Sequence, residues 1–335
     1  GGGRVDGDFR TNWSQQAPRS AWKANIGRGC AGFAIAQGRA LTLGNANGKD
    51  TVWCFEAKTG KILWKHSYSE ALADKYYEGG PNCTPTIDGD RVYTLSKSGK
   101  LLCLNLKDGA VLWQKDYRKD FGGIMPTWGF AAAPVIHKGL LYALPCAKDK
   151  ALYALDPGTG KVLWHSNNKT RAGYAAPIFF QFRGKEVAGV FHGREFVIYD
   201  LKGKGKTLFT HRWRTSYDVN ASNPQVVDNK LFIASGYGMG YAVLDLAGSG
   251  KVLHRDNDLR MIFQNSLLLD GDVIGVFGDK RIDAELLRMD FDSGKVRWRI
   301  DLPGTRGSSL MVGDKLIALS ETGQLICGVP GKSSF

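Results

Sequence analysis

Residues 57–64 read Ala-Lys-Thr-Gly-Lys-Ile-Leu-Trp, and the same phrase returns as Leu-Lys-Asp-Gly-Ala-Val-Leu-Trp at 106–113 and Pro-Gly-Thr-Gly-Lys-Val-Leu-Trp at 157–164. Three weaker copies follow, at residues 205–209, 250–254 and 294–298. In every copy a ring follows the glycine by four residues, and successive rings are 49, 51, 45, 45 and 44 residues apart. This period is typical of a four-stranded propeller blade.

The sequence before each copy predicts three further strands. In residues 84–95, two β-rich runs flank the tight-turn pair Asp88-Gly89. Residues 101–106 alternate as a third strand, and residues 111–115 follow as the outer strand. Four strands joined by tight turns form one antiparallel sheet, which buries its faces by stacking against neighbouring sheets.

The sequence therefore predicts an all-β protein, a seven-bladed β-propeller of four-stranded antiparallel blades. The blades are expected at residues 30–68, 80–117, 127–167, 173–213, 218–257, 261–302 and 305–329. We expect one propeller domain over residues 1–335, with residues 1–19 as an N-terminal extension.

The seventh blade is short of an outer strand, because the chain ends soon after its last turn at Pro330-Gly331. Residues 20–26, Ser-Ala-Trp-Lys-Ala-Asn-Ile, resemble an outer strand with no blade before it. We therefore expect residues 20–27, with Trp22, to supply the missing strand and close the ring. The alternative is that the C-terminal tail imitates that strand, because Phe335 also follows a glycine by four residues.

The chain carries a formal net charge of +13. Many of its lysines belong to the repeated turns, and no helix-turn-helix, RRM or zinc-finger pattern accompanies them. We expect weak attraction to acidic surfaces but no specific nucleic-acid partner. No apolar run has the length of a membrane span, and no export signal is visible in the sequence.

Five of the six cysteines fall at two sets of equivalent places in the predicted blades, and Cys146 ends a second strand. Cys54, Cys103 and Cys327 fall in the middle of third strands and are interpreted as small core residues. Cys30 and Cys83 begin the innermost strands of adjacent blades, where free thiols and a disulfide are both open. No Cys/His spacing matches a zinc site.

The repeat resembles that of PQQ-like, or quinoprotein-like, β-propellers. This superfamily includes the quinoprotein alcohol dehydrogenases and the outer-membrane assembly protein BamB. The likeness runs from Trp22 to Gly331. Residues 77–89 also resemble the start of the second blade in secreted bacterial PQQ-like repeat proteins without an assigned activity. The resemblance implies the propeller fold and a periplasmic or extracellular location.

The chain departs from the quinoprotein alcohol dehydrogenases in its candidate cofactor ligands. The residues that begin the predicted inner strands include no carboxylate; they are Cys30, Cys83, Ala132, Ala175, Ser222, Asn265 and Ser308. Calcium needs several oxygen ligands, usually including carboxylates. The adjacent Cys-Cys pair that those enzymes place over the quinone is also missing. We therefore expect no PQQ, calcium or other metal site.

The longest loops link the blades, at residues 69–82 and 118–129, or join strands two and three, at residues 192–194, 235–240 and 277–285. Both kinds of loop lie on one face of a propeller. The candidate ligand-binding residues on this face are Asn82, Trp128, Tyr174, His192, Arg194, Asn220, Asn223, Tyr237, Gln264 and Arg306. Amides, aromatic faces and arginines suit a neutral or anionic polar ligand. The alternative is a structural role, in which these groups hydrogen-bond to backbone groups at the strand ends and hold water in the central channel.

Two functions from different classes remain open. The first is a non-catalytic propeller that binds a protein or carbohydrate ligand on its loop-rich face, with Trp128 and Tyr174 flanking one sector and Arg194 reaching toward it. The second is an enzyme at the propeller mouth, either a divergent quinoprotein oxidoreductase or a glycan hydrolase or lyase. His192 is then the candidate general base, although the sequence pairs no carboxylate or serine with it.

Overall fold

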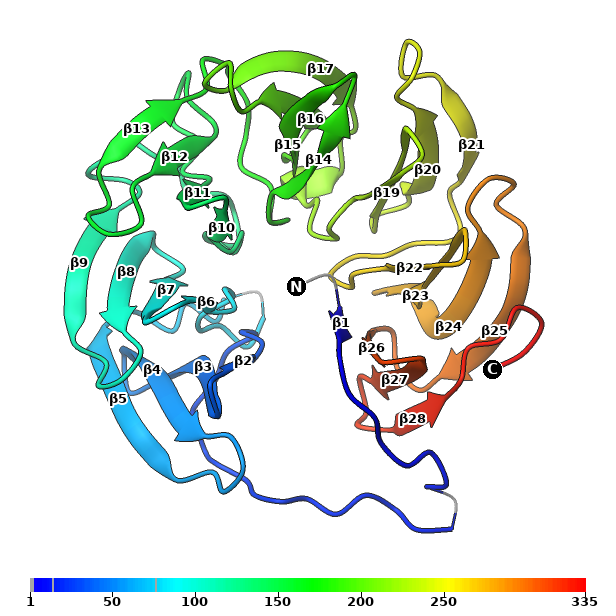
Figure 1. The fold of residues 1–335 in the computed structure, drawn as a ribbon, viewed down its shortest axis with the longest axis horizontal. Helices are drawn as coiled ribbons and strands as arrows, with labels where there is room; N and C mark the ends of the chain where they lie inside the picture. Colours follow the sequence, from blue (N-terminus) through cyan, green and yellow to red (C-terminus); the bar gives the residue numbers. More distant parts are fainter. Residues whose placement is uncertain (1–2, 14, 76) are drawn as a thin grey trace. The chain divides into compact units, whose positions relative to one another are not determined.

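The computed structural model describes residues 3–13, 15–75 and 77–335, and its strands form seven four-stranded sheets. Each sheet corresponds to one predicted blade, and the strand labels in Figure 1 follow chain order. The one helical element in the described ranges is a 3-10 turn, η1 (Ser216–Asp218). The chain divides into two compact units, which are described separately below. The first unit comprises residues 19–177 and 198–209, and the second comprises residues 1–18, 178–197 and 210–335.

The first unit contains three complete antiparallel sheets, in which the strands follow one another along the chain. Blade one consists of β2 (Ala34–Ala36), β3 (Arg39–Ala46), β4 (Lys49–Glu56) and β5 (Ile62–Ser69). Blade two consists of β6 (Thr86–Asp88), β7 (Arg91–Leu95), β8 (Lys100–Asn105) and β9 (Val111–Asp116). Blade three consists of β10 (Val135–His137), β11 (Leu140–Ala143), β12 (Tyr153–Leu155) and β13 (Val162–His165).

Blades five and six are complete within the second unit, and blade four supplies strands to both units. Blade four consists of β14 (Ile178–Phe182), β15 (Lys185–Phe191), β16 (Glu195–Asp200) and β17 (Lys206–Arg212). Blade five consists of β18 (Gln225–Val227), β19 (Lys230–Ser235), β20 (Gly240–Asp245) and β21 (Val252–Asp256). Blade six consists of β22 (Leu267–Leu269), β23 (Asp272–Asp279), β24 (Ile282–Asp290) and β25 (Val296–Leu302).

The seventh sheet differs from the predicted blade in its fourth strand. It consists of β1 (Arg4–Val5), β26 (Gly307–Val312), β27 (Lys315–Ser320) and β28 (Leu325–Gly328). β1 pairs in parallel with the inner strand β26, where the Met311 and Gly313 N–H groups donate to the carbonyls of Gly3 and Val5 at 2.8 and 3.0 Å. The extension thus satisfies the open inner edge of β26.

The prediction that residues 20–27 form the outer strand of blade seven was therefore wrong. Residues 20–27, all of them described, contain no strand, and neither do residues 329–335 of the alternative. The Trp22 ring instead packs on Gly60 of blade one, and its indole N–H donates to the Ala57 carbonyl at 3.0 Å. Trp22 keeps the ring contact of a repeat without forming the strand.

The hydrophobic core lies between neighbouring sheets. In the first unit, one buried cluster joins blades one and two and includes Leu41, Cys54 and Leu102. A second cluster joins blades two and three and includes Cys83 and Cys103. No disulfide joins Cys30 to Cys83. The buried positions of Cys54 and Cys103 confirm their interpretation as core residues, whereas Cys327 is only partly buried.

The ring of one repeat packs on the glycine of the next. Trp64 is buried, and its indole N–H donates to the Leu106 carbonyl at 2.8 Å. Gly109 has a φ of +75°, and a Cβ built there would lie 2.5 Å from the Trp64 ring. The repeated glycine therefore meets two requirements at once, a left-handed backbone and a close approach to a ring.

Replacing Gly109 with alanine is expected to lower the free energy of unfolding by about 2–4 kcal/mol, because strain at positive φ adds to displacement of the Trp64 ring. Gly139 provides a matched control, because it has the same φ of +75° with nothing within 4 Å of a built Cβ. Gly139→Ala should cost only the backbone strain, about 1 kcal/mol. Urea unfolding of both variants measures the difference, and equal losses would contradict the docking role of Gly109.

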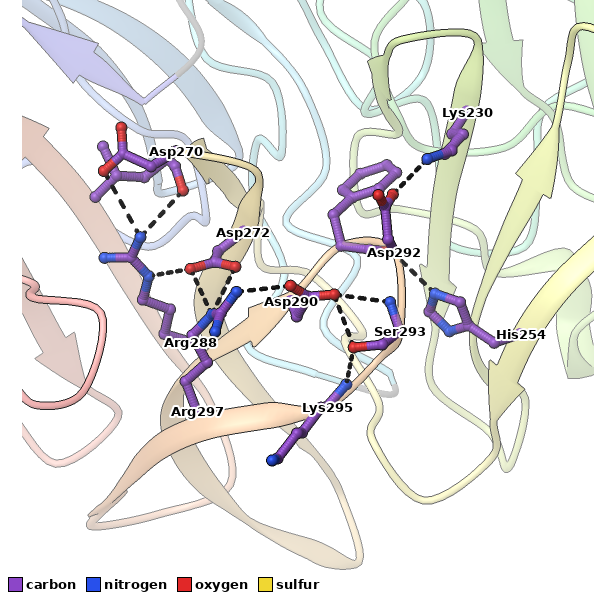
Figure 2. A network of polar contacts seen from close by, with 12 residues as sticks. Lys230, His254, Asp270, Asp272, Arg288, Asp290, Asp292, Ser293, Lys295 and Arg297 are labelled. Atoms are coloured by element: carbon purple, nitrogen blue, oxygen red, sulfur yellow. Dashed lines mark hydrogen bonds and ion pairs between the residues drawn. The ribbon is translucent and has the colours of Figure 1, made fainter.

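Blade six carries a buried ion-pair network (Figure 2). Arg288 pairs with Trp298 across β24 and β25, at the place where Cys54 pairs with Trp64 in blade one. The Arg288 side chain is 1% exposed and its Nε donates to an Oδ of the fully buried Asp272 at 2.5 Å. A second guanidinium, that of Arg297, donates to both Asp272 oxygens at 2.8 and 2.9 Å. The Asp272 carboxylate is thus held between two cations.

The same network holds the turn after β28. Arg288 donates through Nη1 to the Pro330 carbonyl at 2.6 Å, and the Trp298 indole donates to the Gly331 carbonyl at 2.9 Å. The Phe335 ring lies 5.5 Å from the Trp298 ring. The C-terminal segment therefore presents to Trp298 the turn that the other repeats present to their preceding ring.

Candidate functional site: an aromatic pocket

A pocket of about 320 Å³ lies in the first unit, among the loops that follow β5 and β9 and the turn between β7 and β8. Its lining residues are Glu70, Ala71, Ala73, Lys75, Tyr77, Lys97, Ser98, Arg118, Met125, Thr127, Trp128 and Gly129. We call this site the aromatic pocket. Two of its loops, residues 69–82 and 118–129, are inter-blade loops of the face that the sequence predicts to carry function.

Two aromatic rings form one wall of the aromatic pocket. The centroids of Tyr77 and Trp128 are 6.2 Å apart, with an angle of 80° between the rings. The Asn82 carboxamide donates to the Tyr77 hydroxyl at 3.0 Å and to the Trp128 carbonyl at 3.2 Å. The Tyr174 hydroxyl accepts from the Trp128 N–H at 3.2 Å. The structure thus brings together three residues predicted from the sequence, Asn82, Trp128 and Tyr174.

Charged groups of both signs complete the lining. Lys97 is almost fully buried; its Nζ lies 4.3 Å from the Tyr77 centroid and donates to the Ala73 carbonyl at 2.7 Å. Ser98 donates to the Glu70 carboxylate at 2.7 Å. Arg118 is exposed. The pocket therefore combines apolar faces with three cations, Lys75 included, and one carboxylate.

A buried carboxyl group lies behind this lining. Asp50 is 1% exposed, and the Asn45 carboxamide donates to it at 2.6 Å and to the Glu70 carbonyl at 2.9 Å. The second Asp50 oxygen has no hydrogen-bond partner among the described residues. Burial raises the pKa of Asp50 to about 6, with Glu70 adding to the shift and the hydrogen bond from Asn45 opposing it. Asn45 thus connects a titratable interior group to the pocket wall.

The other predicted residues lie in the second unit, where some are exposed and paired. Arg194 forms an ion pair with Asp218 at 2.8 Å. The rings of Tyr237 and the exposed Tyr217 are 6.2 Å apart. Arg306 lies 5.6 Å from the centroid of the exposed Phe263. These groups form local contacts on the loops of their own unit.

The remaining predicted residues of the second unit serve its interior or its loop backbone. His192 and Asn220 are fully buried, and the Asn220 carboxamide donates to the His192 carbonyl at 2.8 Å. Burial lowers the pKa of His192 to about 3, so its imidazole stays neutral at physiological pH. Gln264 is 4% exposed and accepts from two neighbouring backbone N–H groups, while the Asn223 N–H donates to Asn265 at 2.8 Å.

Of the lining residues of the aromatic pocket, sequence reasoning named Trp128 as a member of a site and missed the others, including Tyr77, Lys97 and Met125. Lys97 belongs to Ser96-Lys-Ser-Gly99, one of the tight turns expected between predicted strands, and nothing in the sequence of that turn indicates that the Lys97 ammonium covers Tyr77. Met125 is 47% exposed beside Trp128. The signal available for it was an apolar side chain in a loop already predicted to be functional.

The described residues do not provide the ligand set that a quinoprotein needs. Across the ranges that the structure covers, no three His, Cys, Asp or Glu side chains gather in a metal-binding arrangement. Calcium requires several converging oxygens, so these residues do not fit the metal that accompanies the quinone. That the protein binds neither PQQ nor calcium remains a prediction.

Within the described ranges, no helix has the length and apolar character of a membrane span.

The structural and sequence comparisons bear on the identity of the chain. A family profile described as outer membrane protein assembly factor BamB matches residues 48–300. The chain belongs to this family. Its repeat therefore places it among the PQQ-like propellers that the sequence resembles.

Known members and neighbours agree with this assignment. BamB of Yersinia pestis is 23% identical over 217 residues, which cover 64% of this chain and 50% of that protein, so the chain matches half the length of its relative. The crystal structure of BamB from Moraxella catarrhalis has a TM-score of 0.63 at 18% identity and covers 90% of this chain and 83% of the other. Quinohemoprotein alcohol dehydrogenase ADHIIG of Pseudomonas putida has a TM-score of 0.62 at 12% identity, with coverage of 92% and 65%. The predicted all-β propeller of seven four-stranded blades is confirmed.

Proposed function

We propose that this member of the BamB family is a non-catalytic propeller that binds a protein partner through the aromatic pocket. The observation that carries the proposal is the wall formed by Tyr77, Trp128 and the exposed Met125. Large aromatic side chains and methionine are enriched where one protein inserts a side chain into another. The volume of about 320 Å³ is at the lower end for ligand pockets and suits one side chain of a partner.

The composition of the pocket favours binding over catalysis. Its described lining residues include one carboxylate, Glu70, and neither histidine nor cysteine. A serine nucleophile is usually activated by a histidine base, whereas Ser98 donates directly to the Glu70 carboxylate at 2.7 Å, and both groups belong to the lining. His192, the base considered from the sequence, is fully buried with a pKa near 3. The described lining residues therefore include a serine–carboxylate hydrogen bond but no Ser-His pair of the kind that hydrolases use.

The family supports the choice of a protein partner over a carbohydrate. Its profile is described as an assembly factor for outer membrane proteins, and an assembly factor acts on other proteins. A location outside the cytoplasm, as the sequence resemblance implies, is part of the same proposal.

Replacing Trp128 with alanine should weaken binding at least about tenfold, because central aromatic anchors carry about 2 kcal/mol or more of an interface. A random peptide library displayed on phage, selected on the wild-type protein, supplies the ligands. Fluorescence anisotropy of the selected peptides then gives the affinities of both proteins. Met125→Ala should weaken binding as well.

Ile124 is the matched control for this experiment. It is 59% exposed, next to Met125 in the chain, but it does not line the pocket. Ile124→Ala should change affinity less than about twofold. Selected peptides that bind the Trp128→Ala protein as tightly as the wild type would contradict the proposal.

A further inference from the structure

We propose that the segment which fills the aromatic pocket is an acidic peptide with one apolar anchor residue, and that Asp50 behind the pocket takes up a proton when this peptide binds. The inference rests on the proposed function and names the chemistry of the partner. It comes from three features of the described residues: the apolar wall, the sign of the charges around it, and the link from that wall to Asp50.

The apolar wall requires an anchor residue. Tyr77 and Trp128 meet edge to face, and Lys97 covers the Tyr77 ring at 4.3 Å. Met125 adds a flexible thioether that adapts to the shape of its neighbour. One aliphatic or aromatic side chain of a partner would remove this surface from water.

The charges around the wall favour an anionic partner. Lys75, Lys97 and Arg118 oppose the single carboxylate of Glu70, which is already engaged by Ser98. The whole chain has a net charge of +13, so its long-range field also attracts anions. Complementary charge at an interface raises association rates and selects the partner. Carboxylates that flank the anchor residue would therefore lie close to these cations, of which Arg118 is exposed.

Asp50 is coupled to the pocket by a short chain of hydrogen bonds. The Asn45 carboxamide donates one hydrogen to Asp50 and the other to the Glu70 carbonyl. Glu70 begins the loop that lines the pocket, so the interior carboxyl and the wall share one amide. A change of charge at Asp50 is therefore felt where a ligand would bind.

The groups that face Asp50 come from several packed elements. They are Asn45 at the end of β3, Tyr68 on β5, Glu70 after β5, and Lys97 and Lys100 from blade two. The Tyr68 hydroxyl is buried without a hydrogen-bond partner in the described ranges, and the Lys100 Nζ lies 4.5 Å from its ring. His66, also on β5, has its pKa lowered by burial and by Lys100. The carboxyl is thus held by one amide and by charges that the pocket shares.

The sign of the coupling follows from these charges. An ionised Asp50 places a second negative charge behind the pocket and opposes an anionic ligand. A protonated Asp50 does not. Binding of an anion must therefore favour the protonated form, and by linkage the affinity rises as the pH falls through the pKa of about 6.

Three fluorescein-labelled peptides of equal length test the ligand class. The first has a central phenylalanine flanked by aspartates, the second has the same phenylalanine flanked by lysines, and the third replaces phenylalanine with alanine between aspartates. At pH 7.5 and low salt, anisotropy should show the first binding at least about tenfold tighter than either other peptide. Its affinity should fall as salt is added. Equal affinity for the first two peptides would overturn the inference.

Charge reversal at the rim provides the second arm. Arg118→Glu should weaken the first peptide about tenfold and remove its advantage over the lysine peptide. Lys61→Glu makes the same change of charge at an exposed repeat turn outside the lining and should change affinity less than about twofold. Equal effects of the two variants would show that only net charge matters, and the pocket would lose its role.

The third arm isolates Asp50. Wild-type affinity for the first peptide should rise about threefold between pH 7.5 and pH 5.5, whereas Asp50→Asn should show no such rise. A rise that persists in Asp50→Asn would assign the effect to His66 and overturn this part. Selected phage peptides that need Trp128 for binding but carry no acidic residues would support the proposed function and contradict the present inference. If no selected peptide depends on Trp128, the proposed function itself fails.

Discussion

Replacing Arg288 with methionine is expected to lower the free energy of unfolding by about 3–5 kcal/mol, because the change leaves the fully buried Asp272 with one guanidinium in place of two. It also removes the 2.6 Å hydrogen bond that holds the Pro330 carbonyl. The turn after β28 should then detach from Trp298. Urea unfolding measures the loss, and faster amide hydrogen exchange in the residues that follow β28 reports the detachment.

Arg297→Met is the matched control, because it removes the other guanidinium from the same carboxylate. The Arg297 side chain is 31% exposed, so water replaces much of its interaction with Asp272. Its loss should cost about 1 kcal/mol or less. The double change Arg288→Met with Asp272→Leu should recover much of the stability lost in Arg288→Met, because no buried charge then stays uncompensated. Equal losses for Arg288→Met and Arg297→Met would contradict the role given to burial.

Two buried groups should give opposite contributions to acid stability. His192 has a pKa near 3 in the folded state and about 6.5 when unfolded, so the unfolded chain binds the extra proton and stability falls as the pH drops below about 6.5. Asp50 has a pKa near 6 in the folded state and 3.8 when unfolded, so in this range the folded chain binds more protons than the unfolded chain. The contribution of Asp50 to stability therefore rises as the pH falls from 6 to about 4. In this window the two contributions nearly cancel.

Single substitutions should expose each contribution. Between pH 6 and pH 4.5, at about 1.4 kcal/mol per pH unit for each proton, His192→Leu should gain about 2 kcal/mol relative to the wild type. Asp50→Asn should lose about 2 kcal/mol over the same interval. Urea midpoints at the two pH values give both numbers. The unfolding free energy of the double variant should change with pH as that of the wild type does. Single variants whose unfolding free energy also follows the wild type would refute both assignments.

The blade architecture was predictable because one short pattern contains both halves of a contact. The glycine of Gly109-Ala-Val-Leu-Trp113 receives the ring of the preceding repeat, and the tryptophan enters the following one. The closing strand was not predictable in the same way. β1 has only two residues, Arg4 and Val5, and its parallel pairing depends on the open edge of β26 rather than on any local pattern.

The site was predictable only in part. Loop length identified residues 69–82 and 118–129, and Asn82, Trp128 and Tyr174 lie together as neighbours of those loops. His192 and Gln264 were expected at the mouth but are buried, because the sequence does not tell which ends of inner segments are covered by later loops. Arg288 was missed for a related reason, since its charge is compensated by residues that come together only through the fold.

The contact between ring and glycine also bears on how such chains can change over evolution. A duplicated unit that runs from one turn to the next contains its own tryptophan and its own glycine. Unequal recombination therefore inserts a blade that can form the contact with both of its neighbours. Point mutations at the contact are more constrained, because even the smallest side chain, that of alanine, would collide with the Trp64 ring if it replaced Gly109. Families built from such repeats should therefore vary more readily in the number of repeats than in the glycine and tryptophan that form this contact.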